Sequence, residues 1–122
     1  MKYVISGAVM TGHGVWEYRP TTISEVKRWL REGGWVSAVK YPATAEILRR
    51  LTGVSIPLSD RKVVLRPGDE ALVFRLKYES PNTHRFLPSL SKIIKNPRLQ
   101  KECVELGFLR LIKEFSREGG TR

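Results

Sequence analysis

The sequence predicts a single α/β (α+β) domain in which a mixed sheet of about five strands is flanked by helices. Apolar runs of strand length alternate along the chain with segments of helical period. The 122 residues, 41% of them hydrophobic, suffice for one core. No apolar run approaches the roughly 18 residues that a membrane span needs, so we expect no membrane partner. We expect the globular domain to span residues 1–115 and residues 116–122 to form a flexible, charged tail.

The first third of the chain predicts a strand, a turn, a second strand and a helix. Tyr3–Met10 is mostly apolar and reads as a strand. The glycine-bearing loop Ser6–Gly14 is most simply a hairpin turn, with Val15–Tyr18 returning as a short strand. Thr22–Glu25 has the spacing of a helix capping box, and Gly33-Gly34 ends the helix.

The middle of the chain predicts a buried strand, a second helix and a hairpin. Trp35–Val39 is a short apolar run. Pro42 suits the first position of a helix, and Gly53 suits the position just after its end. An Arg-Pro-Gly-Asp turn of type II then joins two strand-like runs, Lys62–Arg66 and Glu70–Tyr78, into a predicted hairpin.

The last third is less regular. Glu79–Pro88 is polar, carries two prolines and reads as a loop. Ser89–Lys95 has helical character, and Arg98–Glu105 follows the Asn-Pro break as a second short helix. Leu106–Phe115 is a strand or a helix, because the apolar run is too short for its period to decide.

Charge and cysteine content restrict the kind of partner. The net charge of +10 and sequence pI near 10.2 favour an anionic partner, such as nucleic acid, a nucleotide or a membrane surface. The alternative is a solvated lysine- and arginine-rich surface, as in heat-adapted proteins. Cys103 is the only cysteine, which excludes an intramolecular disulfide. The absence of HxxxH and CxxC motifs predicts no metal centre, and no cofactor is expected.

The first candidate site is the junction between the strand ending at Val39 and the helix beginning at Pro42. A helix N-terminus carries partial positive charge and free amides, which stabilise a phosphate or carboxylate. Here Lys40 adds a full charge, Tyr41 adds a phenol, and the next residues offer amides and a hydroxyl at Ala43 and Thr44. The simpler alternative is a helix start that packs on the sheet and binds nothing.

Two loops are further candidates. The first follows the predicted first strand, where glycine lets a backbone approach a ligand closely. The second, Lys77–Arg85, combines donors, acceptors and a titratable base in one segment of the kind that closes over ligands. A hairpin turn and a solvated connection are the respective alternatives. The candidate residues in these loops are Ser6, Gly7, Ala8, Thr11, Glu79, Asn82 and His84.

The sequence as a whole resembles a family of small dimeric proteins of archaeal viruses, bacterial mobile elements and prophages, whose best-understood members are ring nucleases acting as type III anti-CRISPR proteins. The resemblance rests on "ISGAVMTGHGVWEY", "WVSAVKYPATAEILRRLTGVSIPLSDRKVVLRPGDEALVFRL" and, more weakly, "GFLRLI". It implies a two-fold homodimer in the host cytoplasm that holds cyclic tetra-adenylate across the dimer axis. It also implies metal-independent cleavage, in which a ribose 2′-hydroxyl attacks the phosphate and a histidine protonates the leaving oxygen.

This chain departs from the family pattern at the residues that the resemblance makes functional. The family histidine falls on Tyr41, and the ordinary pKa of a phenol, about 10, makes tyrosine a poor general acid at neutral pH. The resemblance places catalysis on Tyr41 and Asn82, and His84 is a candidate substitute for the missing histidine. The other family positions fall on Lys40 for a glycine, Ser6 for an asparagine, Asp60-Arg61 for an asparagine-arginine pair, and Glu79 and Asn82 for an arginine and a glutamate.

Three functions are consistent with the sequence. The first is a homodimer that binds cyclic tetra-adenylate and either cleaves it slowly or sequesters it. The second is a non-enzymatic protein that binds DNA or RNA through a basic dimer surface. The residues that favour the second are Trp16, Arg19, Lys27, Arg28, Arg31 and Trp35. The third is a protein–protein interaction module.

Overall fold

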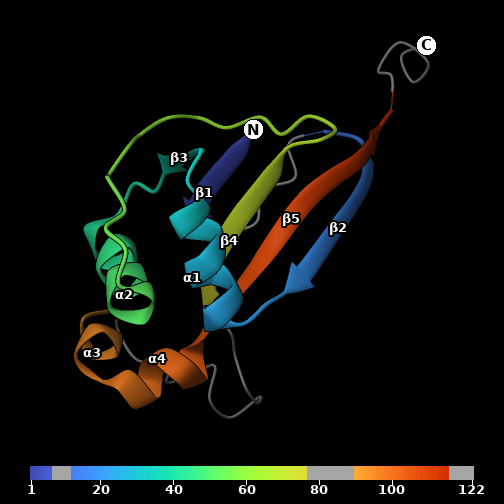
Figure 1. Cartoon of the computed structure of the whole chain (residues 1–122). Helices are drawn as coiled ribbons and strands as arrows, with labels where there is room; N and C mark the ends of the chain where they lie inside the picture. Colours follow the sequence, from blue (N-terminus) through green and yellow to red (C-terminus); the bar gives the residue numbers. More distant parts are fainter. Residues whose placement is uncertain (7–11, 77–89, 116–122) are drawn as a thin grey trace.

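The structure is a computed structural model that describes residues 1–6, 12–76 and 90–115. These ranges form a five-stranded mixed sheet with helices packed on one face (Figure 1), which confirms the predicted fold class. The strands are β1 (Lys2–Ser6), β2 (Gly14–Pro20), β3 (Trp35–Ala38), β4 (Glu70–Leu76) and β5 (Val104–Glu114). The helices are α1 (Ile23–Glu32), α2 (Pro42–Thr52), α3 (Leu90–Lys95) and α4 (Pro97–Cys103). None of these helices is long and apolar enough to cross a membrane.

The order of the strands in the sheet is β2-β5-β4-β1-β3. β1 lies between β4 and β3 and runs parallel to both. β5 runs antiparallel to β4 on one side and to β2 on the other. Because β1 and β3 are parallel neighbours, the chain leaves both at the same edge of the sheet, which brings the residues that follow them together.

The helix ends follow the local signals in the sequence. The Thr22 hydroxyl accepts a hydrogen bond from the Glu25 amide at 3.2 Å, as a capping residue does. Pro42 is the first residue of α2, where its missing N–H costs no hydrogen bond. Gly53 follows α2 in the left-handed conformation, with φ +76°. The predicted boundaries of both helices are confirmed.

The predicted hairpin after α2 is wrong, although its turn is present. The Asp69 amide donates to the Arg66 carbonyl at 2.9 Å, and Gly68 has φ +95°. Residues 61–66, however, form no strand, because both edges of β4 are taken by β1 and β5. Residues 59–66, called the strap below, instead pack against the sheet face opposite the helices through Val63 and Leu65.

Other differences concern the N-terminal turn and the C-terminal run. β2 pairs with β5 and is separated from β1 by two strands, so the predicted β1–β2 hairpin is wrong. The C-terminal run is a strand, and this strand, β5, begins at Val104. The predictions for the loop residues 7–11, the polar loop within 77–89 and the tail 116–122 lie outside the described residues.

The sheet has a helix-covered face and a strap-covered face. Successive residues of each strand alternate between them, as Val4 and Ile5 do in β1. The core of the helix-covered face includes Val4, Val26, Ile47, Leu48, Leu72, Phe74, Ile93 and Phe108. The core of the strap-covered face consists of Ile5, Ala38, Leu65, Ala71, Val73 and Leu109, with Trp16 and Tyr18 partly buried beside them.

A polar cluster joins three strands near the free edge of the sheet. The Tyr18 hydroxyl donates to a Glu105 carboxylate oxygen at 2.7 Å. Arg75 forms an ion pair with Glu105 at 3.6 Å, and its guanidinium carbon lies 5.8 Å from the centre of the Tyr18 ring. Burial and then Glu105 raise the pKa of Tyr18 to about 12. A Cβ atom on Gly107 would collide with the Tyr18 ring, so a larger residue there would displace the ring.

Candidate functional site: a basic pocket

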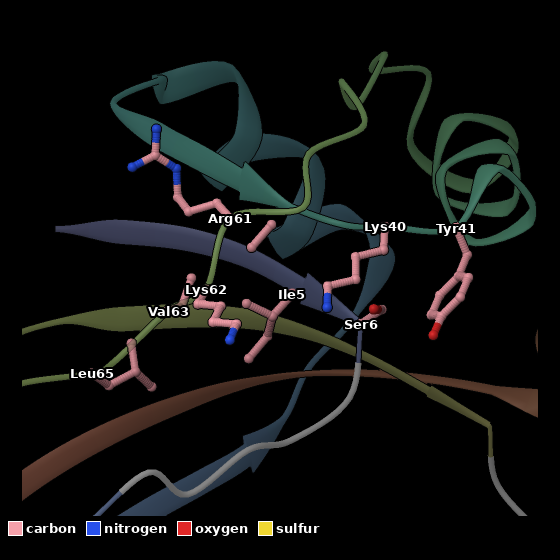
Figure 2. Close-up of a pocket in the computed structure, with 9 residues that line it drawn as sticks. Ile5, Ser6, Lys40, Tyr41, Arg61, Lys62, Val63 and Leu65 are labelled. Atoms are coloured by element: carbon pink, nitrogen blue, oxygen red, sulfur yellow. The ribbon is translucent and has the colours of Figure 1, made fainter.

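A pocket of about 340 Å³ lies where the chain leaves β1 and β3 (Figure 2). Its floor is formed by residues at the ends of these two strands, and the strap closes one side. The lining residues are Ile5, Ser6, Ala38, Lys40, Tyr41, Arg61, Lys62, Val63 and Leu65. The pocket therefore combines an apolar floor with a basic rim, and its residues come from both halves of the described chain.

The first wall of the pocket is the junction between β3 and α2. Lys40 and Tyr41 connect the two elements, and Tyr41 precedes the first residue of α2. Both side chains are exposed, Tyr41 by 59%. Figure 2 shows the Lys40 amine between Ile5 and Ser6, and the Tyr41 ring on the other side of Ser6. A charged donor, a phenol and a serine hydroxyl thus lie along one side of the pocket.

The second wall is the strap. Lys62 extends over Ile5, whereas the Arg61 guanidinium is turned outward at the rim (Figure 2). Two apolar side chains hold this segment against the sheet: Val63 is half-buried and Leu65 is only 2% exposed. The strap thereby keeps two cations beside the pocket without being part of a helix or a strand.

Hydrogen bonds around Ser37 tie the two walls together. The Ser37 hydroxyl donates to the Pro57 carbonyl at 2.5 Å and accepts from the Val39 amide at 3.2 Å. The Ser59 amide donates to the Val39 carbonyl at 2.9 Å, and Leu58 forms a parallel bridge with Val39. The chain that leaves α2 is therefore fixed beside the end of β3 just before the strap begins.

The pocket is strongly cationic. Lys40, Arg61 and Lys62 line it together with Tyr41 and Ser6, and no acidic residue is among its lining residues in the described ranges. None of the three cations forms an ion pair with another described residue, whereas many arginines elsewhere do, such as those that flank Glu17, Glu46 and Glu102. Anions bind where cations are free of protein partners, so the arrangement suits a phosphate or a carboxylate.

Four of the residues singled out from the sequence are brought together here: Ser6, Lys40, Tyr41 and Arg61. Ala43 and Thr44 do not line the pocket. Ala43 is half-buried and Thr44 is only 3% exposed, which leaves the Thr44 hydroxyl unable to reach a ligand in the pocket. The remaining candidates, Gly7, Ala8, Thr11, Glu79, Asn82 and His84, lie outside the described residues.

Sequence reasoning missed Lys62 and the apolar lining of the pocket. The alternating pattern around Val63 and Leu65 was the available signal, and it was assigned to a strand. The same alternation fits a segment that lays every second side chain on the core. Lys62 was missed with it, because a hairpin strand would not have placed this lysine beside Lys40. In the described ranges, no group of three or more metal-ligating side chains gathers that could hold a metal ion.

Comparison with known proteins places this fold in a family. Residues 2–86 match the model of the STIV B116-like family. The chain is 32% identical over 81 residues to protein 26 of Sulfolobus islandicus filamentous virus, a match that covers 63% of this chain and 69% of that protein. The structure of B116 of Sulfolobus turreted icosahedral virus is similar, with a TM-score of 0.63 over 90% of this chain and 99% of that chain, at 14% identity, which shows a common fold. The chain therefore belongs to the STIV B116-like family of small archaeal-virus proteins.

Proposed function

We propose that the basic pocket binds cyclic tetra-adenylate and that the protein acts as an antagonist of type III CRISPR defence in the host cytoplasm. The observation that carries this proposal is the placement of Lys40 and Lys62 at one pocket, with Arg61 at its rim and no acidic residue among the described lining residues. A phosphodiester carries one negative charge, and charge-assisted hydrogen bonds to lysine and arginine are among the strongest that proteins make. The exposed ring of Tyr41 offers a surface on which an adenine can stack.

The size of the pocket supports a shared site. A volume of about 340 Å³ lies near the lower end of the roughly 300–1,000 Å³ typical of small-molecule sites. A ring of four nucleotides exceeds what such a pocket encloses. Two copies related by a two-fold axis would offer two identical half-sites to a ligand that itself has repeating symmetry. The proposal therefore includes a homodimer with one ring bound per dimer.

The chemistry of the pocket favours binding over rapid turnover. Ring cleavage without a metal proceeds by attack of a ribose 2′-hydroxyl on the adjacent phosphate, and the leaving 5′ oxygen must gain a proton. Losing a good general acid typically costs about 10² to 10⁴-fold in rate. With Tyr41 at the pocket and Asn82 and His84 as further candidates, we propose sequestration or slow cleavage, with neither a metal nor a cofactor.

The test is calorimetric titration of the protein with cyclic tetra-adenylate in metal-free buffer, followed by chromatography of the recovered nucleotide. We expect one ring per dimer and at least tenfold weaker binding by the Lys40→Ala/Tyr41→Ala variant, because half of the rim is removed. Lys27→Ala, which removes a cation from α1, is the matched control and should bind normally. Absence of heat at micromolar protein, or unchanged binding by the double variant, would contradict the proposal.

The recovered nucleotide separates the two forms of the proposal. Intact ring after prolonged incubation indicates sequestration, and linear product indicates cleavage. His84→Ala then tests the substitute acid: a role for His84 predicts a fall in the cleavage rate with little change in affinity. An unchanged cleavage rate would remove His84 from the mechanism.

A second candidate function, nucleic-acid binding, is favoured by the outer face of α1. Lys27, Arg28 and Arg31 line a shallow depression there with Ser24 and one acidic residue, Glu32. None of the three cations forms an ion pair with another described residue, and Glu32 is paired with Lys2. Arg19 does not join them, because its guanidinium makes two hydrogen bonds of 3.2 Å to Glu25. One helix face thus offers three free cations to a phosphate backbone.

The aromatic residues give this second candidate little support. Trp16 and Trp35 are half-buried, and their indole N–H groups donate to backbone carbonyls at 3.2 and 2.8 Å. Salt distinguishes the two candidates. Binding to an open basic face should weaken steeply between 50 and 200 mM salt, by about 10³-fold or more for six phosphate contacts. Binding in a pocket should weaken far less, because its ion pairs are partly shielded from solvent.

A further inference from the structure

We propose that Ser37 is a positioning residue of the basic pocket, which sets the placement of the strap cations relative to Lys40 and thereby the affinity of the pocket for polyanions. This inference rests on the proposed role of the pocket as an anion site. Ser37 does not line the pocket, and its side chain is 7% exposed. Its influence must therefore pass through the residues to which it is hydrogen-bonded.

Ser37 lies at a junction where the residues that precede the two walls are next to each other. Its hydroxyl donates to Pro57, which precedes the strap, and accepts from the amide of Val39, which precedes Lys40. Ser59 then donates to the carbonyl of Val39 at 2.9 Å. Two hydrogen bonds of the buried Ser37 hydroxyl therefore connect Pro57 with Val39, and the bond from Ser59 to Val39 lies next to them.

The strap has few other directional restraints. At its start the Arg61 amide donates to the Ser59 hydroxyl at 3.1 Å, and at its far end the Arg66 amide donates to an Asp69 carboxylate oxygen at 3.0 Å. Within the described part of the chain, the main-chain groups of Lys62–Leu65 make no hydrogen bond. Val63 and Leu65 hold the strap by apolar contact, which fixes its depth on the sheet but is non-directional. The hydrogen bonds at the Ser37 junction therefore determine the position at which the strap starts.

Electrostatic repulsion gives this restraint a role. Lys40 on the first wall and Lys62 on the second repel one another across the pocket when no anion lies between them, and Arg61 at the rim adds to the positive charge. A strap held only by apolar contacts could relax away from Lys40. The Ser37 junction opposes that movement and keeps the cations in place for an incoming anion, so that less ordering is needed on binding.

A double-mutant cycle tests the inference. Ser37→Ala should weaken binding about five- to tenfold, since it leaves the Pro57 carbonyl without its partner. In the Arg61→Ala/Lys62→Ala background the same substitution should have no further effect, because the strap carries no cation to misplace. Ser37→Thr, which keeps the hydroxyl, should restore most of the affinity.

Thr52 provides a matched control. It is also buried, and its hydroxyl donates to the Leu48 carbonyl at 2.6 Å and accepts from the Val54 amide at 3.2 Å. This pattern parallels that of Ser37, but it lies at the opposite end of α2 from the pocket. Thr52→Val should therefore destabilise the protein to a similar extent and leave anion affinity unchanged.

Two probes separate this inference from the proposed function. Binding is measured with cyclic tetra-adenylate and with inorganic tripolyphosphate, which carries charge without adenine. If only tripolyphosphate binds, the nucleotide proposal fails, and the affinities in the double-mutant cycle are measured with tripolyphosphate instead. If neither probe binds, both proposals are overturned. The Ser37 inference is also overturned if Ser37→Ala binds the anion as tightly as Thr52→Val does. It is overturned as well if Ser37→Ala still weakens binding in the Arg61→Ala/Lys62→Ala variant.

Hydrogen exchange keeps the inference testable if Ser37→Ala does not fold. In the wild-type protein the amides of Val39 and Ser59 should exchange slowly, because both are hydrogen-bonded at the junction. The amides of Lys62–Leu65 should exchange faster and gain protection when tripolyphosphate is added. Rapid exchange at Val39 would overturn the inference, because the junction would then not persist in solution.

Discussion

The two faces of the sheet are covered in different ways. On one face, helices with periodic apolar residues and well-formed ends bury Val4 and Leu72 completely. On the other, the cover in the described ranges is the strap, which contributes only Val63 and Leu65 to the core. α1 buries three of its ten residues and α2 buries four of its eleven, whereas the strap buries one, Leu65, and leaves Arg61 and Lys62 exposed beside the pocket. The helices thus contribute most to the stability of the sheet, whereas the strap leaves charged side chains exposed beside the pocket.

The largest effect should come from the helix-covered face. Leu72→Ala should lower the free energy of unfolding by about 3–4 kcal/mol, because surrounding helices and strands cannot collapse into the space. Urea unfolding measures this loss, and Leu72→Met is the volume-conserving control. The affinity per folded molecule for cyclic tetra-adenylate should not change. A parallel loss of affinity would show that the two faces are not independent.

The next effect should come from the anchor of the strap. Leu65→Ala should cost about 2 kcal/mol, the low end for a buried leucine, because an irregular segment can settle into part of the cavity. In contrast to Leu72→Ala, it should also weaken anion binding several-fold by releasing Lys62 from its place. Parallel urea and calorimetric measurements check both changes. Equal unfolding costs for Leu65→Ala and Leu72→Ala would contradict the comparison.

A smaller effect is expected at the polar cluster near the free edge. Tyr18→Phe should cost about 1 kcal/mol at neutral pH through the lost hydrogen bond to Glu105. The pKa of Tyr18 is raised from 10.0 to about 12 by burial and Glu105, so the folded state holds this proton more tightly than the unfolded state. The stabilisation is complete below pH 10 and is lost as pH rises toward 12.

Thermal unfolding of wild type and Tyr18→Phe between pH 8 and pH 12 checks this prediction. The difference between their melting temperatures should shrink as pH rises through this range. A difference that stays constant up to pH 12 would show that Tyr18 does not titrate differently in the two states.

The smallest effect is expected on the outer surface of α2. The hydrogen bonds that Arg49 and Arg50 donate to Glu46 lower the pKa of its carboxyl from 4.5 to about 2. The folded state therefore favours the charged form, and the stabilisation is present above pH 4.5 and lost as pH falls toward 2. Glu46→Gln should melt slightly lower than wild type at pH 6 and equally at pH 2. A difference that grows on acidification would contradict this assignment.

The helices could be predicted from the sequence because their signals are local. Thr22, Pro42 and Gly53 each fix one helix end through their own backbone or side-chain chemistry. The strand pairings could not be predicted from the sequence. The alternation of Val63 and Leu65 is the same in a hairpin strand and in an irregular segment that packs on a sheet. The irregular segment forms here because β5, which lies far along the chain, already pairs with the edge of β4.

The part of the pocket that is formed by residues adjacent in sequence could be predicted. Lys40 and Tyr41 stand at a strand-to-helix junction that the sequence marks with Pro42. Ser6 was a candidate because it begins the glycine-bearing loop Ser6–Gly14 and falls on an asparagine position of the family that the sequence resembles. Lys62 and the role of Ser37 depend on where the strap lies, and no local pattern encodes a contact between segments 20 residues apart, such as that of Ser37 with Pro57.

The strap has a consequence for which substitutions the pocket can accept. Its two apolar anchors, Val63 and Leu65, are interleaved with exposed residues, among them Arg61, Lys62 and Val64. Substitutions at Arg61 and Lys62, which line the pocket, alter its charge and shape without a penalty in core packing. A library randomised at positions 61 and 62 should therefore yield folded proteins whose affinity for anions varies widely.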